Sequence, residues 1–207
     1  MSKVDDKKQQ KRESLLDSAF QLFIEHGFSK TSISDIVRNA GVAKGTFYLY
    51  FKDKFDIKNH LIAHKASQVF QNAYNSMCQQ QITDFEDQVI FITDHILDQL
   101  AANRNLVLLL SKHLSWGFLK SSVFQAPGTD SFTDPPTILT IFHSLLEQAQ
   151  YSYRDPEIMM YLILELIGGS SYNAILYQQP VPLAQLKPYL YRTVREILRQ
   201  HREESAL

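Results

Sequence analysis

Apolar residues recur at three- and four-residue steps along nearly every segment long enough to judge, the spacing that gathers side chains on one face of an α-helix. The alternation typical of a strand is not the dominant pattern. The first stripe of this kind contains Leu15, Leu16, Ala19, Phe20 and Phe23. Gly27, followed by an apolar residue, is typical of a helix C-terminus. The pattern predicts an all-α fold.

Capping signals place the remaining helices. Ser32 with Asp35 three residues later is typical of a helix start, and Gly41 is typical of the turn that follows that helix. Asp53 is typical of the start of a further, long helix. We expect further helices over residues 32–40, 44–50, 53 to beyond 70, 84–102, 105–121, 135–150, 156–177 and 182–202. Asp134-Pro135 and Asp155-Pro156 each place a capping acid before a proline. Pro188 suggests that the last helix begins near Leu186.

Composition narrows the class of protein. The chain has 207 residues and a single cysteine, Cys78, so it forms no internal disulfide. Its longest apolar run, residues 158–167, contains Glu165 and is shorter than the ~20 residues of a membrane span. No apolar stretch long enough for the middle region of a signal peptide follows the charged N-terminus. We therefore expect a cytoplasmic protein without a membrane partner.

Charge divides unevenly along the chain. Residues 1–65 hold 12 Lys and Arg against 8 Asp and Glu, a net charge of +4, and the rest carries −5. A basic first third suits a polyanion such as DNA. On charge alone a solvated helix surface is the more common explanation, so the charge does not decide the function.

The run "TSISDIVRNAGVAKGTFYLYFKDK" (residues 31–54) has the pattern of a helix-turn-helix. Its first helix would pack through Ile33, Ile36, Val37 and Ala40, with Val42 and Phe47 at the seam. The other face of the second helix shows Lys44, Gly45, Thr46, Tyr48 and Tyr50, a mixture that a DNA duplex can approach closely. A helical hairpin that packs against protein is the alternative.

Within this run, "GVAKGTFYLYFKDK" preceded by "TSISDIV" resembles the signature of the TetR family of bacterial transcription regulators. The resemblance covers roughly residues 10–60. It implies a three-helix DNA-binding head (residues 1–54) and a larger helical domain for ligand binding and dimerisation (residues 55–207). It also implies phosphate contacts from Ser32, Tyr48, Tyr50 and Lys54, and base-edge positions for Ser34, Lys44, Gly45 and Thr46.

Two residues depart from the family pattern. Ala43 stands where Ser or Thr commonly caps the recognition helix, so we expect that helix to fray and to become ordered on DNA. Phe55 stands where the family usually has an acid, which removes negative charge beside Lys54.

The resemblance further implies a homodimer through the last two helices, a palindrome-like operator and release by a small-molecule ligand. An apolar seam suited to a partner helix contains Leu183, Leu186, Leu190, Val194 and Ile197, although the same seam can pack on its own chain. Gly168, Gly169, Ser170 and Ser171 suggest close backbone packing. The candidate ligand residues are His113, Trp116, Phe142, His143, Tyr161, Glu165 and Tyr172, which combine aromatic surface with polar tips.

Other functions have little support in the sequence. There is no phosphate loop, dinucleotide fingerprint or serine elbow, so we expect no enzyme and no cofactor. His60 and His64 lie one helical turn apart, but no acid completes a metalloprotease pattern, and we expect no metal site. A DNA-binding activator or architectural protein without ligand control stays open beside the ligand-released repressor.

Overall fold

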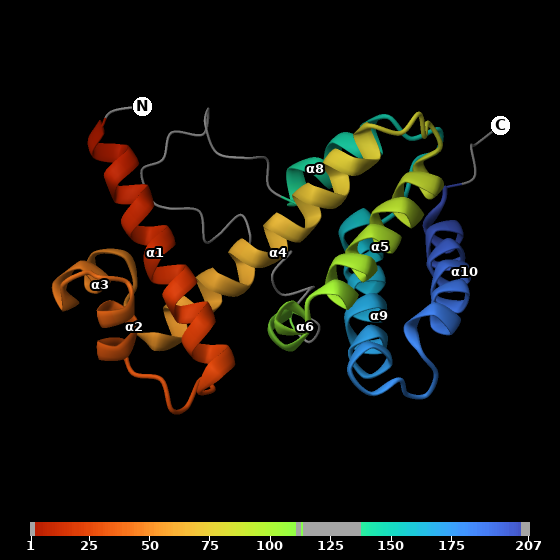
Figure 1. Cartoon of the computed structure of the whole chain (residues 1–207). Helices are drawn as coiled ribbons and strands as arrows, with labels where there is room; N and C mark the ends of the chain where they lie inside the picture. Colours follow the sequence, from red (N-terminus) through yellow and green to blue (C-terminus); the bar gives the residue numbers. More distant parts are fainter. Residues whose placement is uncertain (1–2, 111–112, 114–137, 204–207) are drawn as a thin grey trace. The chain divides into compact units, whose positions relative to one another are not determined.

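The computed structural model describes residues 3–110, 113 and 138–203, and throughout these ranges the regular elements are helices (Figure 1). This confirms the predicted all-α class. The helices are α1 (Lys3–Glu25), α2 (Ile33–Asn39), α3 (Lys44–Tyr50), α4 (Lys54–Cys78), α5 (Phe85–Ala102), α6 (Arg104–Leu110), α8 (Ile138–Glu147), α9 (Pro156–Tyr177) and α10 (Leu183–His201).

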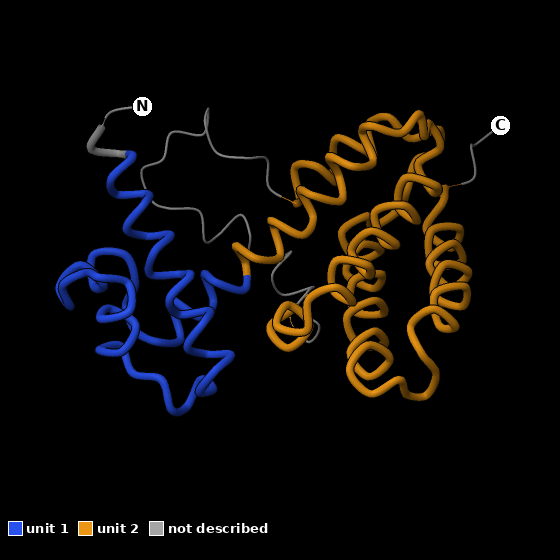
Figure 2. Tube along the Cα trace, viewed as in Figure 1, with its two compact units in different colours: residues 1–62 blue, residues 63–207 orange. Residues whose placement is uncertain are grey.

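The chain forms two compact units, residues 1–62 and 63–207, and α4 contributes to both (Figure 2). In the first unit α1, α2 and α3 form a three-helix head, and buried residues at the start of α4 extend its apolar core. Gly27 and Gly41 have φ angles of 81° and 66°, the left-handed region that glycine adopts without strain. Both glycines lie where the sequence predicts that a helix ends in a turn. A functional division after residue 54 stays a prediction.

In the second unit α9 packs against α5, α6 and α10. Its length and apolar composition alone would suit a membrane span. Its inward residues, among them Met159, Ile163 and Ile167, are buried by these neighbouring helices. Packing within the unit therefore accounts for much of its apolar character.

The apolar seam of α10 packs on its own chain, which is the alternative to the partner-helix seam suggested above. Leu190, Val194 and Leu198 are buried within the single chain, because α10 lies against α9 and α5. A three- and four-residue stripe shows that a helix has an apolar face, but it does not tell which helix covers that face. Leu183, Leu186 and Ile197, the other members of the predicted seam, are half-buried in the single chain.

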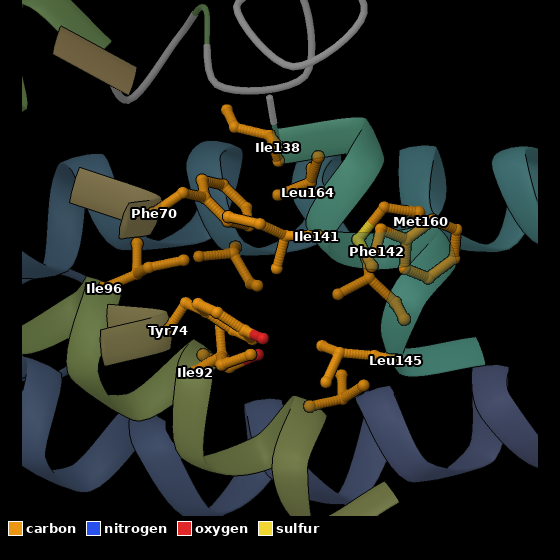
Figure 3. A pocket seen from close by; sticks show the side chains of 14 residues that line it. Phe70, Tyr74, Ile92, Ile96, Ile138, Ile141, Phe142, Leu145, Met160 and Leu164 are labelled. Carbon is orange, nitrogen blue, oxygen red and sulfur yellow. The ribbon is translucent and has the colours of Figure 1, made fainter. Parts of the chain in front are cut away.

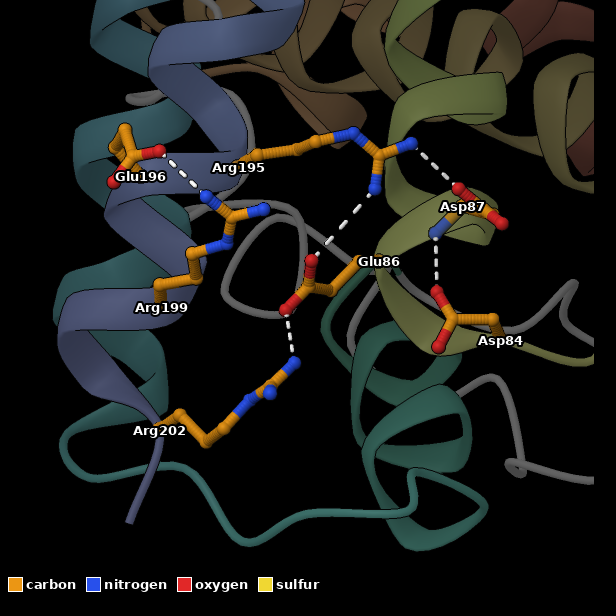
Figure 4. A network of polar contacts seen from close by, with 7 residues as sticks. All are labelled: Asp84, Glu86, Asp87, Arg195, Glu196, Arg199 and Arg202. Carbon is orange, nitrogen blue, oxygen red and sulfur yellow. Dashed lines mark hydrogen bonds and ion pairs between the residues drawn. The ribbon is translucent and has the colours of Figure 1, made fainter. Parts of the chain in front are cut away.

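Ion pairs attach the C-terminal half of α10 to the start of α5 (Figure 4). The buried carboxylate of Glu86 pairs with Arg195 at 3.7 Å and also with Arg202. Asp87 pairs with Arg195 at 2.5 Å. A buried carboxylate is stable only with such partners, so these contacts fix the position of α10 on its own chain.

A second polar cluster lies nearer the start of α10. Lys187 contacts both Asp94 and Asp98 of α5, and the Tyr191 hydroxyl donates to Asp94. Burial acts to raise the pKa of Asp94, but the hydrogen bonds from Lys187 and Tyr191 outweigh it and hold that pKa below its usual value. Asp94 therefore stays ionised and holds the two helices together.

The predicted start of the helix at Pro156 is confirmed, but the cap predicted for it and the start predicted near Leu186 were wrong. Asp155 has a left-handed backbone (φ 47°) and makes no capping hydrogen bond with its side chain, although α9 does begin at Pro156. Helix α10 begins at Leu183 and continues through Pro188, so the proline does not set its start. The Asp134-Pro135 start and most of the predicted helix 105–121 lie outside the described residues.

Candidate nucleic-acid interface and apolar cavity

Helices α2 and α3 form the expected helix-turn-helix. The Ser32 hydroxyl accepts a hydrogen bond from the backbone N–H of Asp35, and the Asp35 carboxylate accepts one from the N–H of Ser32, which completes a capping box. The Ser32 hydroxyl and backbone hydrogen bonds, with Arg38 nearby, lower the pKa of Asp35. Ile36, Val37 and Phe47 are buried between the two helices. Local polar contacts and one apolar seam thus fix the pair.

The recognition helix α3 starts at Lys44, as predicted, and its N-cap is Ala43, whose side chain makes no capping hydrogen bond. The backbone carbonyl of Ala43 accepts from the N–H of Thr46 at 2.9 Å. The first turn of this seven-residue helix thus lacks side-chain support at its N-cap.

Replacing Ala43 with serine should raise the free energy of unfolding by about 0.5–2 kcal/mol, because a serine hydroxyl can accept from the first-turn N–H groups. Thermal unfolding followed by circular dichroism measures the change. Ala43→Val is the control, since valine cannot cap and should give no gain. An unchanged melting temperature for Ala43→Ser would contradict the idea that a missing cap weakens this helix.

One side of α3 faces away from the core of the head. Phe47 is buried, whereas Lys44, Gly45, Tyr48 and Leu49 are exposed. At 3.6 residues per turn, Gly45 and Leu49 each lie about 160° around the helix from Phe47. These two residues therefore form the outermost line of the head surface on α3, which we call the Gly45–Leu49 ridge.

Gly45 is not explained by the fold of its own chain. Its backbone is helical without a positive φ, and a Cβ added to it would meet no atom within 4 Å. Glycine costs a helix about 1 kcal/mol relative to alanine. The absence of a side chain here is useful only if something outside the described chain comes close to the backbone of α3.

The other residues expected at DNA differ in how accessible they are. Ser34 is exposed, and Tyr48 is 53% exposed. Thr46 and Tyr50 are half-buried, and the Ser32 hydroxyl serves the capping box. Their contacts with DNA stay predictions.

Lys54 has a role inside the head that the sequence did not suggest. Its ammonium group donates to the carbonyl oxygens of Phe28 and Thr31 at 2.8 and 2.9 Å, and it lies over the Phe28 ring at 4.5 Å. It thereby ties the start of α4 to the loop before α2. The phosphate contact expected of Lys54 stays a prediction, and it would compete with these bonds.

A second candidate site is a small apolar cavity among α4, α5, α8 and α9 (Figure 3). None of the described residues that line it is charged. The polar ones are Thr93 and Tyr74, whose hydroxyl points into the cavity. A hydrogen bond with Cys78 and partial burial raise the pKa of Tyr74, so its hydroxyl stays neutral. The cavity suits an uncharged hydrocarbon group.

The ligand residues proposed from the sequence fit this cavity poorly. Of the seven, Phe142 lines it. His143, Tyr161 and Glu165 lie on exposed surface. His113 and Tyr172 are half-buried outside the lining, and Trp116 lies outside the described residues. Those residues combine aromatic rings with polar tips, whereas the cavity walls are mostly aliphatic side chains, which sequence alone does not distinguish from ordinary core.

The histidine pair has protein partners. His60 lies 3.6 Å from Asp56 and against the Phe51 ring, and His64 contacts Gln68 at 3.1 Å. Among the described residues, no three His, Cys, Asp or Glu side chains are grouped as metal ligands.

Comparison with known proteins relates the first unit to a family of regulators. Residues 15–59 match the family described as "Bacterial regulatory proteins, tetR family". The fatty acid metabolism regulator protein of Bacillus subtilis is 32% identical over 107 residues, which are 52% of this chain and 54% of that protein. The chain thus spans about half the length of this relative.

Two solved structures share the fold along most of the chain. The transcriptional regulator FadR of Bacillus subtilis, in complex with stearoyl-CoA, has a TM-score of 0.60 at 19% identity and covers 88% of this chain and 96% of its own. FadR of Thermus thermophilus, in complex with lauroyl-CoA, has a TM-score of 0.59 at 19% identity and covers 95% of this chain and 98% of its own. At this identity the likeness establishes the fold alone.

Proposed function

We propose that this chain is a transcriptional repressor of the TetR family, whose model matches residues 15–59. It binds operator DNA through α3 and releases it on binding a ligand with a long hydrocarbon chain. The observation that carries the DNA-binding proposal is Gly45, a helical glycine that the fold does not require, at the centre of an exposed face. The net charge of +4 on residues 1–65 supports a polyanionic partner.

Selection of bound sequences from random duplex DNA tests DNA binding directly and supplies the operator. We expect a palindrome-like sequence whose half-sites lie roughly 34–36 Å apart, one turn of DNA, or a multiple of this. Affinity should fall steeply as salt rises, because bound phosphates release counterions. Failure to enrich any sequence would contradict the proposal.

We propose that the repressor is a homodimer formed by exposed faces of α9 and α10. Exposed positions 158, 162, 165, 169, 173 and 177 recur at three- and four-residue steps along α9. Large apolar side chains on this surface are Ile158, Leu162, Tyr177 and, from α10, Tyr189. Such a surface is costly to leave in water, and a second copy would bury it.

The ligand proposal rests on the chemistry of the cavity and on the two acyl-CoA complexes among the structural neighbours. An acyl chain would occupy the apolar walls without leaving a charge unpaired. Phe70 and Tyr74 of the cavity belong to α4, the same continuous helix that begins at Lys54 in the head. A ligand that moves α4 can therefore change the binding energy of DNA.

Replacing Ile96 with phenylalanine should raise the concentration of lauroyl-CoA or stearoyl-CoA needed to release the operator by at least about tenfold, since the larger ring fills space that the ligand needs. Fluorescence anisotropy of labelled operator measures release.

Leu97→Phe is the matched control, because Leu97 is also buried in α5 but does not line the cavity. If the same ligand concentration released the operator equally from both variants, the ligand would have to bind outside this cavity. If acyl-CoA released operator from neither the parent protein nor the control, that result would argue against acyl-CoA control. It would leave the proposal of DNA binding by α3 unaffected.

A further inference from the structure

Leu49 is the most exposed large apolar side chain among the described residues, at 80%. It lies on α3 one helical turn after Gly45, and both point away from the buried Phe47. Leucine cannot form a hydrogen bond, so it contributes nothing to a phosphate contact. Within this chain it packs little, so its purpose is not the stability of the head.

Leu49 and Gly45 lie one turn apart on the same face of α3. The side chain of Leu49 leaves the Cβ position of Gly45 open. Gly45 offers no Cβ that would hold a partner away, and no described atom lies within 4 Å of that position. The ridge therefore combines an apolar side wall with an open approach to the helix backbone.

Resting on the proposed DNA-binding function, we infer that Leu49 reads the C5 methyl group of a thymine in each operator half-site. In the major groove the thymine methyl is the apolar group that a base edge presents, whereas the other exposed atoms are hydrogen-bond donors and acceptors. Leu49 thus adds a sequence preference that the polar residues Ser34, Lys44 and Thr46 do not supply.

The test uses the operator selected by the full chain, with each symmetric pair of thymines replaced in turn by deoxyuridine, which lacks the methyl group. Burying one such group is worth about 0.8 kcal/mol, a factor of about four in affinity. We expect one pair of positions at which the substitution weakens binding of the parent protein by about 15-fold, the product of the two half-sites. Leu49→Ala should bind the thymine and deoxyuridine operators equally.

Phe55→Ala is the matched control, because Phe55 is another exposed apolar residue of the head, at 64%, but lies outside α3. It should keep the full preference for thymine. Equal binding of thymine and deoxyuridine by the parent protein at every position, or an unchanged preference in Leu49→Ala, would overturn the inference and leave DNA binding intact. A chain that selects no operator would overturn the proposed function and this inference with it.

Discussion

Replacing Gly45 with leucine should abolish operator binding while the head becomes more stable. The new side chain meets open space in the protein alone, because no atom lies within 4 Å of the added Cβ. In the complex it would occupy the space into which the duplex must come. We expect affinity to fall at least about 100-fold, or about 2.7 kcal/mol. Leucine should meanwhile stabilise the helix by about 0.5–1 kcal/mol.

Anisotropy with labelled operator and thermal unfolding of the same preparation measure the two changes. Gly45→Ala provides a graded comparison, since one methyl group should weaken binding less than an isobutyl group does. Loss of affinity together with loss of stability would mean that the fold itself needs Gly45. Undiminished affinity in Gly45→Leu would place DNA on another surface of the head.

Local signals in the sequence predicted the head well. The capping box of Ser32 and Asp35, the left-handed turns at Gly27 and Gly41 and the start of α3 at Lys44 each depend on residues a few positions apart. Their geometry is dictated by backbone hydrogen bonds and steric limits that a short segment carries with it. For this reason the recognition helix could be located before its surroundings were known.

Features that depend on distant segments were harder to predict. Lys54 binds carbonyls more than twenty residues earlier in the chain, and the walls of the cavity come from four helices. Glu165 lies in an apolar run of the sequence, but its position on α9 is exposed. Its charge is therefore not buried within the single chain and does not require a cationic ligand as a partner. Helical periodicity defines a face of a helix, whereas tertiary packing decides what that face contacts.

Gly168 and Gly169 illustrate how one short run can serve two surfaces. Gly168 and Ser171 are buried in their own chain, which accords with close packing of α9 against its neighbours. Gly169 is exposed, and a Cβ added to it would meet nothing within 4 Å. Like Gly45, it is therefore a helical glycine that packing within the chain does not require. We propose that a second copy comes closest to α9 at this point.

Replacing Gly169 with arginine should therefore convert the dimer into a folded monomer. The long charged side chain is accommodated easily at the surface of one chain, but its bulk would hold two α9 helices apart. We expect the dimer dissociation constant to rise at least about 100-fold, measured by sedimentation. Operator affinity should fall with it, because two linked heads bind more tightly than one.

The matched control is Ala101→Arg, which adds the same side chain to an exposed position at the end of α5, a helix outside the proposed α9 and α10 dimer surface. It should leave both the dimer and operator affinity unchanged. Helical content and melting temperature should be preserved in both variants, because each arginine points into solvent and arginine is a good helix former. A Gly169→Arg protein that stays dimeric at micromolar concentration would exclude this surface, and the dimer would then have to form through another face of the chain.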